Sequence, residues 1–226
     1  MTRRLVVVGS GIAGLYAALL ASDPGSRPGS GGGPAAEVVL LTKGALEESN
    51  TFYAQGGVSA VLAPEEAAPG DSVAAHIADT LAAGAGLNNP DAVRILCTEA
   101  VRDIAGLRRF GVDFDLGADG GPALGLEAAH SAARVVRVKG DQAGDQIMQT
   151  LIAAVHAAPS VQVLENTQAL RLETEAATVT GIWITRADAP SAPVLIKAPG
   201  VLLAGGGSGG LYAHTTNPPR IRGQVI

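Results

Sequence analysis

The chain has 226 residues, of which 47% are hydrophobic and only 16% are charged. This composition is typical of one or two globular domains and excludes a disordered chain. The formal net charge of −5 argues against nucleic acid as a partner. No apolar run approaches the roughly 20 residues that span a bilayer, so we expect no membrane partner either.

Cys97 is the only cysteine. An intramolecular disulfide and a cysteine metal cluster are therefore excluded, no metal site is expected, and a reducing, cytoplasmic location is predicted. Cys97 lies in an apolar helical pattern, which favours buried packing over a nucleophile. Thr2, Arg3 and Arg4 precede a short apolar run, but the GxGxxG motif interrupts that run, so a signal peptide is not expected.

The N-terminus predicts a strand, a tight glycine turn and a helix. The apolar run 5–8 stops at Gly9, and leucines then recur at helical spacing among alanines. Between them lies a GxGxxG motif, whose glycines allow a tight turn, the approach of a pyrophosphate and close helix–strand packing. Backbone N–H groups at the helix start would bind the phosphates. An ordinary glycine-rich connection is the alternative.

The residues after this helix complete a βαβ unit. Residues 23–34 are rich in Gly, Pro and Ser and predict a flexible surface loop, and 37–42 predict a second, parallel strand. A dinucleotide fold usually places an acidic residue at the end of that strand. Lys43 stands there instead, either as a cation that reaches a phosphate or ribose, or as a solvated lysine.

The rest of the chain predicts helices, strands and one meander. Apolar periodicity predicts helices over 71–83 and 90–110, the second starting at Asn89-Pro90 with an apolar face that includes Leu96 and Val101, and a third capped by Asp141. Further strands are expected at 161–164 and 201–204, the second of them a buried parallel strand. An antiparallel meander is expected at 170–173, 179–185 and 194–198.

Three further stretches carry candidate ligand contacts. Residues 49–60 mix hydroxyls, an amide, glycines and two aromatic rings, as a surface for a flat ligand does, and the strand 201–204 runs into Gly205 and Gly206. In the irregular segment 124–140, the cluster of Glu127, His130, Ser131 and Arg134 suits either a charged small molecule or a surface salt-bridge group. Asp113 and Asp115 are interpreted as solvated loop positions.

In combination these stretches resemble the L-aspartate oxidases, within the flavoprotein family of succinate dehydrogenase and fumarate reductase. The matching stretches are 8–15, 41–44, 50–57, 79–86, 127–134 and 212–218. The resemblance implies an α/β fold: a Rossmann-like FAD-binding domain over 1–219, with a parallel sheet and an antiparallel β-meander. The residues expected to contact FAD are Gly9, Ser10, Gly11, Ile12, Ala13, Gly14, Lys43, Asn50, Thr51, Phe52, Tyr53, Ala54, Gln55, Gly56, Gly57, Gln168, Ala169, Gly205 and Gly206.

The resemblance also implies a reaction and its residues. Relatives of the succinate dehydrogenase type attach the flavin covalently to a histidine where this chain has Asn50, so the FAD should be non-covalent. Glu127 matches a glutamate that orients the substrate through its ammonium group, and His130 and Arg134 are further catalytic candidates. The implied reaction oxidises L-aspartate to iminoaspartate with oxygen or fumarate as acceptor, in NAD and quinolinate biosynthesis, with quinolinate synthase as a partner.

The chain also departs from the family pattern. Alanines at 128 and 129 replace glycines, and the tail 220–226 diverges where an aspartate is expected near Gln224. The capping domain is absent, so we expect a fragment or frameshifted product with little activity alone and weak FAD retention. The alternatives are a fumarate reductase or succinate dehydrogenase flavoprotein, and a non-catalytic FAD-binding fragment.

Overall fold

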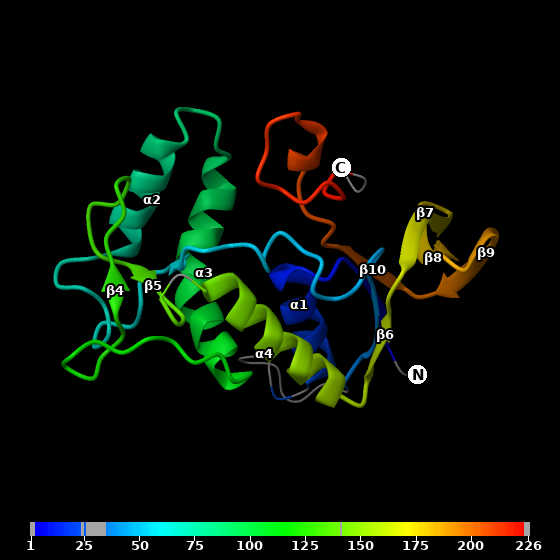
Figure 1. Ribbon diagram of the computed structural model, residues 1–226, viewed down its shortest axis with the longest axis horizontal. Coiled ribbons are helices and arrows are strands. Elements are labelled where there is room, and N and C mark those ends of the chain that lie inside the picture. Colours follow the sequence, from blue (N-terminus) through cyan, green and yellow to red (C-terminus); the bar gives the residue numbers. More distant parts are fainter. Residues whose placement is uncertain (1–2, 24, 26–34, 141, 224–226) are drawn as a thin grey trace. The chain divides into compact units, whose positions relative to one another are not determined.

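A computed structural model describes residues 3–23, 25, 35–140 and 142–223 (Figure 1). The chain divides into two compact units, the first comprising 1–53 and 147–226 and the second 54–146. The predicted flexible loop falls almost entirely outside the described residues, as do the predicted helix cap Asp141 and Gln224 in the tail.

The first unit is built on a parallel sheet. Its strands are β1 (Arg4–Val8), β2 (Glu37–Leu41), β6 (Val161–Leu164) and β10 (Gly200–Leu203), in the order β10-β1-β2-β6. All three neighbouring pairs are parallel, and α1 (Ile12–Ser22) connects β1 to β2. The βαβ unit and the strands predicted at 161–164 and 201–204 are confirmed. The burial predicted for the second of them is wrong: β10 is the edge strand of this sheet, and Leu202 and Leu203 are 39% and 45% exposed.

A three-stranded antiparallel meander packs on this sheet. It consists of β7 (Thr167–Glu175), β8 (Thr178–Arg186) and β9 (Ala189–Lys197), each longer than the sequence pattern predicts. Ala176 and Ala177 form the two-residue β7–β8 turn with positive φ angles, although alanine gives no turn signal. The apolar cluster between sheet and meander contains Val6, Val8, Val39, Leu41, Ile182, Ile184 and Ala198.

Close backbone packing at the start of α1 explains two of the glycines in the motif. Gly9 has a φ of +116°, and a Cβ there would lie 2.1 Å from the carbonyl oxygen of Ala204, which follows β10. A Cβ on Gly14 would lie 1.9 Å from the Gly9 oxygen. Strand, turn and helix therefore meet at distances that only glycine permits, as the motif predicts.

The second unit combines two helices with a small sheet. Helices α2 (Val73–Ala83) and α3 (Pro90–Arg109) accompany three antiparallel strands of two residues each, ordered β3-β5-β4: β3 (Val58–Ser59), β5 (Val135–Val136) and β4 (Leu124–Gly125). The sequence predicted an irregular segment over 124–140, because strands this short show no readable alternation. The remaining elements are α4 (Ala143–Ala157) and a 3₁₀ turn, η2 (Gly209–Leu211).

The predicted start of α3 is confirmed, and its predicted apolar face needs correction. Asn89 caps the helix by accepting hydrogen bonds from the N–H groups of Asp91 and Ala92 at 2.9 and 3.2 Å. The helix buries Cys97 as expected, together with Val93, Ile104 and Leu107. Leu96 and Val101, assigned to the same face, are exposed instead.

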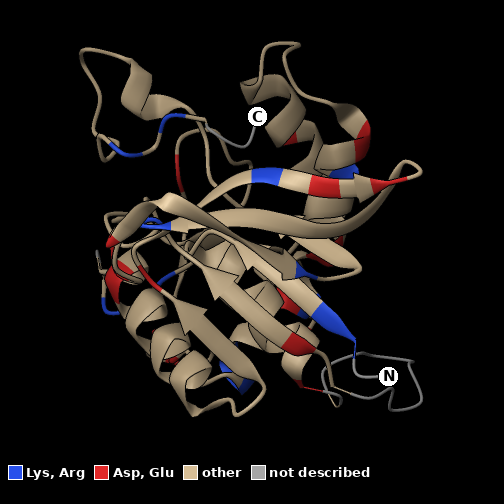
Figure 2. Cartoon of the chain, turned by 90° about the vertical axis from the view of Figure 1, so that its right-hand side faces the viewer, with Lys and Arg blue, Asp and Glu red and all other residues tan. Residues whose placement is uncertain are grey.

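Charged residues of both signs are interspersed along the elements that face the viewer in Figure 2. Among the described residues, none of the helices combines the length and apolar character that a membrane crossing requires.

Substituting Gly14 tests the packing of α1 on the glycine turn. Gly14→Ala forces a methyl group against a backbone oxygen that cannot rotate away, so the free energy of unfolding should fall by roughly 1–3 kcal/mol. Gly207→Ala is the matched control, because a Cβ at Gly207 meets no atom within 4 Å. Urea unfolding of both variants measures the difference, and equal stability of the two would contradict the packing described.

Candidate functional site

The N-cap residue of α1 supplies no capping side chain. Gly11 occupies the cap position, and no acidic residue lies in the first turn. Thr51 Oγ1 accepts the Ile12 N–H at 3.1 Å. The first-turn N–H groups have no carbonyl partner inside a helix, and together with the helix dipole they form a site for an anion.

Gly11 differs from the other glycines of the motif. Its φ and ψ angles of −69° and 177° suit any residue, and a Cβ there would only touch Thr51 Oγ1 at 3.4 Å. The protein's own packing therefore does not require glycine at position 11. Close approach of a ligand to the backbone gives a reason for it.

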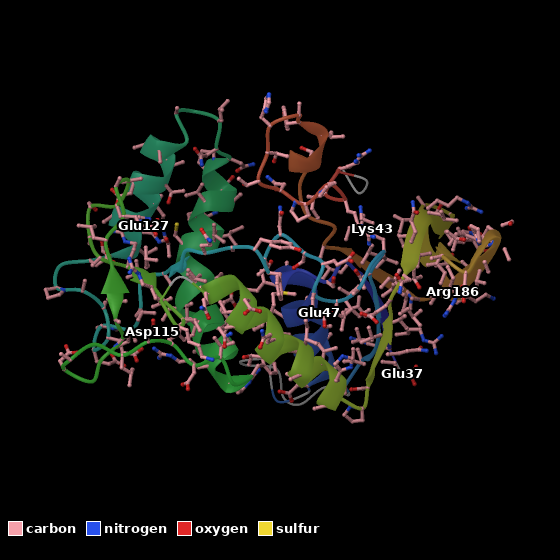
Figure 3. The ribbon with its side chains drawn as sticks, in the orientation of Figure 1. Glu37, Lys43, Glu47, Asp115, Glu127 and Arg186 are labelled. Carbon is pink, nitrogen blue, oxygen red and sulfur yellow. The ribbon has the colours of Figure 1, made fainter. Side chains whose placement is uncertain are left out.

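The end of β2 lies next to this turn. Ser10 Oγ donates to Thr42 Oγ1 at 3.0 Å in a buried contact, and the Gly9 N–H donates to the Leu41 carbonyl at 2.9 Å. Lys43, labelled in Figure 3, follows directly and donates through Nζ to the Arg220 carbonyl oxygen. Burial, followed by the charges of Arg220 and Arg222, lowers the pKa of Lys43.

The segment around Asn50 is joined to the C-terminal part of the chain. Asn50 Nδ2 donates to Asn217 Oδ1 at 2.6 Å, and Asn217 Nδ2 donates to Thr215 Oγ1 at 2.9 Å. Phe52 and Tyr53 pack edge to face with ring centroids 5.4 Å apart. The sequence pointed to the segments 50–57 and 212–218 but not to their pairing. Residues 167 positions apart carry no local signal of contact.

The returning chain also contacts the glycines after β10. Gly206 has a φ of +77°, and the neighbouring Gly207 carbonyl accepts the Gly223 N–H at 3.0 Å. Of the two residues expected near an adenosine, Gln168 is exposed on β7 and Ala169 packs partly against the core. Next to them, the Thr167 N–H donates to the Thr42 carbonyl at 2.8 Å, so this strand start lies beside the end of β2.

In the second unit, Glu127 lies next to the glycine pair that ends the 50–57 string. A Cβ on Gly56 would lie 3.9 Å from Glu127 Oε1, while a Cβ on Gly57 would lie 2.1 Å from the Val136 carbonyl oxygen. Gly57 is thus required by the small sheet, whereas Gly56 leaves space beside an exposed carboxylate (Figure 3). In the same string Gln55 is exposed, and the Ala54 carbonyl accepts the Gly144 N–H at 2.9 Å.

Arg134 is the centre of a buried ion cluster, and its side chain is 0% exposed. Its Nη2 and Nε donate to the two oxygens of Asp71 at 2.7 and 3.1 Å, and its Nη1 donates to Asp79 Oδ2 at 2.6 Å. The Ser131 N–H and hydroxyl both donate to the same Asp79 oxygen at 2.8 Å. Of the two interpretations of the sequence cluster, a salt-bridge group describes Arg134, but the group is buried and not on the surface as expected.

These contacts shift the pKa values of Asp79 and Arg134. Hydrogen bonds from Ser131, and then from Arg134, hold the pKa of Asp79 well below its ordinary value. Burial alone would lower the pKa of Arg134, but its bonds to Asp71 and Asp79 outweigh burial and raise it. Both groups are therefore stabilised in their charged forms.

Two histidines border the cluster. His130 lies with Nδ1 3.2 Å from Arg134 Nη1 and Nε2 3.3 Å from Ser59 Oγ. The His76 ring centroid is 5.6 Å from that of His130, and its buried Nδ1 has no hydrogen-bond partner among the described residues. Burial, followed by Arg134 and His130, lowers the pKa of His76. Sequence reasoning missed His76, Asp71 and Asp79 because they lie on or before α2, far from residue 130 in the chain.

Acid unfolding tests the Asp79 carboxylate. Because its pKa in the folded chain lies below the ordinary 3.8, the unfolded state binds more protons at acid pH. The free energy of unfolding should therefore fall as the pH drops from about 5 through 3.8, and Asp79→Asn should flatten that fall. Urea titrations at a series of pH values measure the slope, with the exposed Asp113→Asn as control. A slope that Asp79→Asn leaves unchanged would contradict the assignment.

Comparisons with known proteins agree with this geometry. Over residues 4–226 the chain matches the family described as "FAD binding domain". It is 46% identical to the L-aspartate oxidase of Caulobacter vibrioides over 98% of its length, and 43% identical to that of Agrobacterium fabrum over 98%. It covers 40% and 39% of those two proteins, so the chain spans about two fifths of their length.

Solved structures show the same fold. A quinol fumarate reductase of E. coli superimposes with a TM-score of 0.82 at 25% identity, over 98% of this chain and 35% of that one. The predicted Rossmann-like fold with its meander, and FAD as the cofactor, are thereby confirmed. The chain belongs to the FAD binding domain family.

Proposed function

We propose that this chain is the FAD-binding part of an enzyme that oxidises L-aspartate to iminoaspartate, with oxygen or fumarate as the acceptor. The 46% identity to an L-aspartate oxidase supports the substrate, and the fumarate reductase likeness supports a dicarboxylate chemistry. We further propose a place in NAD and quinolinate biosynthesis, a cytoplasmic location and quinolinate synthase as a partner, in keeping with the same relatives.

The residues of the first unit fit FAD. The first-turn amides of α1 would hold the pyrophosphate, since Gly11 leaves their approach open. Lys43 at the end of β2, the segment beginning at Asn50 and the glycines after β10 would line the rest of the cofactor. When bound, FAD supplies the hydride-accepting ring, and the protein supplies position and charge.

We propose that the FAD is held without a covalent bond. The string 50–57 contains neither histidine nor cysteine. Asn50, at the position where covalently linked relatives carry histidine, has a carboxamide that donates to Asn217. That contact fixes the Asn50 side chain and offers no nucleophile to a flavin.

The position of Glu127 is the observation that best supports an amino-acid substrate. Its carboxylate is exposed beside Gly56, while the Arg134 guanidinium is engaged by Asp71 and Asp79. An exposed carboxylate attracts an ammonium group through charge-assisted hydrogen bonds. Glu127 would therefore bind the amine of L-aspartate and orient its Cα–H bond.

The cofactor site is tested at Gly11. Gly11→Val places a branched side chain where the pyrophosphate would lie, so the Kd for FAD should rise at least about tenfold, while the urea midpoint changes little. Flavin fluorescence quenching by the 226-residue chain measures the Kd. Undiminished FAD affinity in a folded Gly11→Val variant would overturn the placement of the pyrophosphate.

The substrate is tested at Glu127, in the full-length protein that contains this chain. Glu127→Gln removes the charge that faces the ammonium, so kcat/KM for L-aspartate should fall roughly 10–100-fold, as expected for a hydrogen bond to a charged group. Fumarate has no ammonium group, so its reduction to succinate, with chemically reduced methyl viologen in place of L-aspartate as the electron donor, should stay within about twofold. Peroxide formation and succinate release are the measurements, and Glu65→Gln, at an exposed carboxylate of the same unit, is the control.

Other outcomes distinguish the alternatives. Turnover of succinate but not of L-aspartate by the unmodified protein would assign it to the succinate dehydrogenase type. Equal losses for L-aspartate and fumarate in Glu127→Gln would contradict ammonium binding by Glu127.

A further inference from the structure

The two ring nitrogens of His130 contact groups of different chemistry. Nδ1 lies 3.2 Å from Arg134 Nη1, and Nε2 lies 3.3 Å from Ser59 Oγ. A guanidinium carries five N–H donors, no acceptor, and stays protonated at all ordinary pH values. A serine hydroxyl can both donate and accept. Nε2 can therefore either donate a hydrogen bond to its partner or accept one, whereas Nδ1 can only accept.

We infer that Arg134 is a positioning residue that fixes His130 as the neutral tautomer with its proton on Nε2. A proton on Nδ1 would point at an N–H of Arg134, leaving the short contact without an acceptor. Nδ1 is thus the acceptor, and Nε2–H donates to the Ser59 hydroxyl. This assignment follows from the chemistry of the partners rather than from hydrogens placed in the structure.

The guanidinium cannot turn away to relieve that constraint. Asp71 holds it through two hydrogen bonds and is itself only 1% exposed, and Asp79 holds Nη1, the same nitrogen that contacts His130. Asp79 in turn fixes the main chain at Ser131, one residue after His130. Two carboxylates therefore fix the position of the Arg134 guanidinium, and the main chain held at Ser131 fixes the position of the His130 ring.

The other titratable groups around His130 are His76, Asp71 and Asp79. Burial, and then the charge of Arg134, lower the pKa of His76, whose ring centroid is 5.6 Å from that of His130. Asp71 and Asp79 both form ion pairs with the guanidinium, Asp79 through the same nitrogen that contacts His130. Within the proposed function, on which this last step rests, His130 then acts as a hydrogen-bond donor through Nε2 and is not the proton-abstracting base.

The tautomer can be read directly by long-range ¹H–¹⁵N correlation spectra of the histidine-labelled 226-residue chain near pH 7.5. The His130 signals are assigned by their loss in His130→Gln. We expect an unprotonated Nδ1 and a protonated Nε2. A protonated Nδ1, or an imidazolium, would overturn the inference. Neither FAD nor L-aspartate is present, so this result is independent of the proposed function.

Two variants show whether Arg134 or Ser59 sets the tautomer of His130. Arg134→Met removes the donor, and the single tautomer should give way to an exchange-averaged mixture. Ser59→Ala removes only the partner of Nε2, and the proton should stay on Nε2. If Arg134→Met fails to fold, Ser59→Ala still decides: a shift of the proton to Nδ1 would show that the hydroxyl sets the tautomer and would overturn the role of Arg134.

Discussion

Three backbone segments meet at Gly9 more closely than any side chain would allow. The Gly9 N–H donates to the end of β2, and its Cα faces the carbonyl of Ala204 at the end of β10. Gly14 brings α1 down onto the same turn. This contact places a helix N-terminus at the carboxyl edge of a parallel sheet, where the strand ends, the glycine run and the 50–53 segment of the same unit can surround a ligand. We propose that FAD binding depends on this arrangement.

The second unit depends on a different interaction, the burial of one guanidinium between two carboxylates. An unpaired charge in that position would be strongly destabilising, so the cluster ties α2, the residue before its cap, and the turn at 130–131 together. Asp71 and Asp79 already engage the Arg134 guanidinium, and the Glu127 carboxylate is exposed.

Local patterns in the sequence were sufficient for the strand–turn–helix start and for the helices, and insufficient for contacts between residues far apart in the chain. A glycine motif between an apolar strand and a helix has one common structural solution, and Asn89-Pro90 gives an unambiguous helix start. The partners of Arg134 could not be found this way, because nothing in the local sequence distinguishes Asp71, before α2, or Asp79, within α2, from an ordinary charged residue. The pairing of Asn50 with Asn217 and the exposure of Leu96 likewise depend on tertiary packing rather than on periodicity.

The central claim is that the first-turn amides of α1 bind the diphosphate of the cofactor. Backbone amide chemical shifts of the isotopically labelled chain, recorded during titration with ADP, test it directly, because ADP carries the diphosphate without the flavin. The account predicts that the largest saturable shifts occur at Gly11, Ile12, Ala13 and Gly14. Saturable binding that leaves these four amides unmoved and shifts others instead would contradict it.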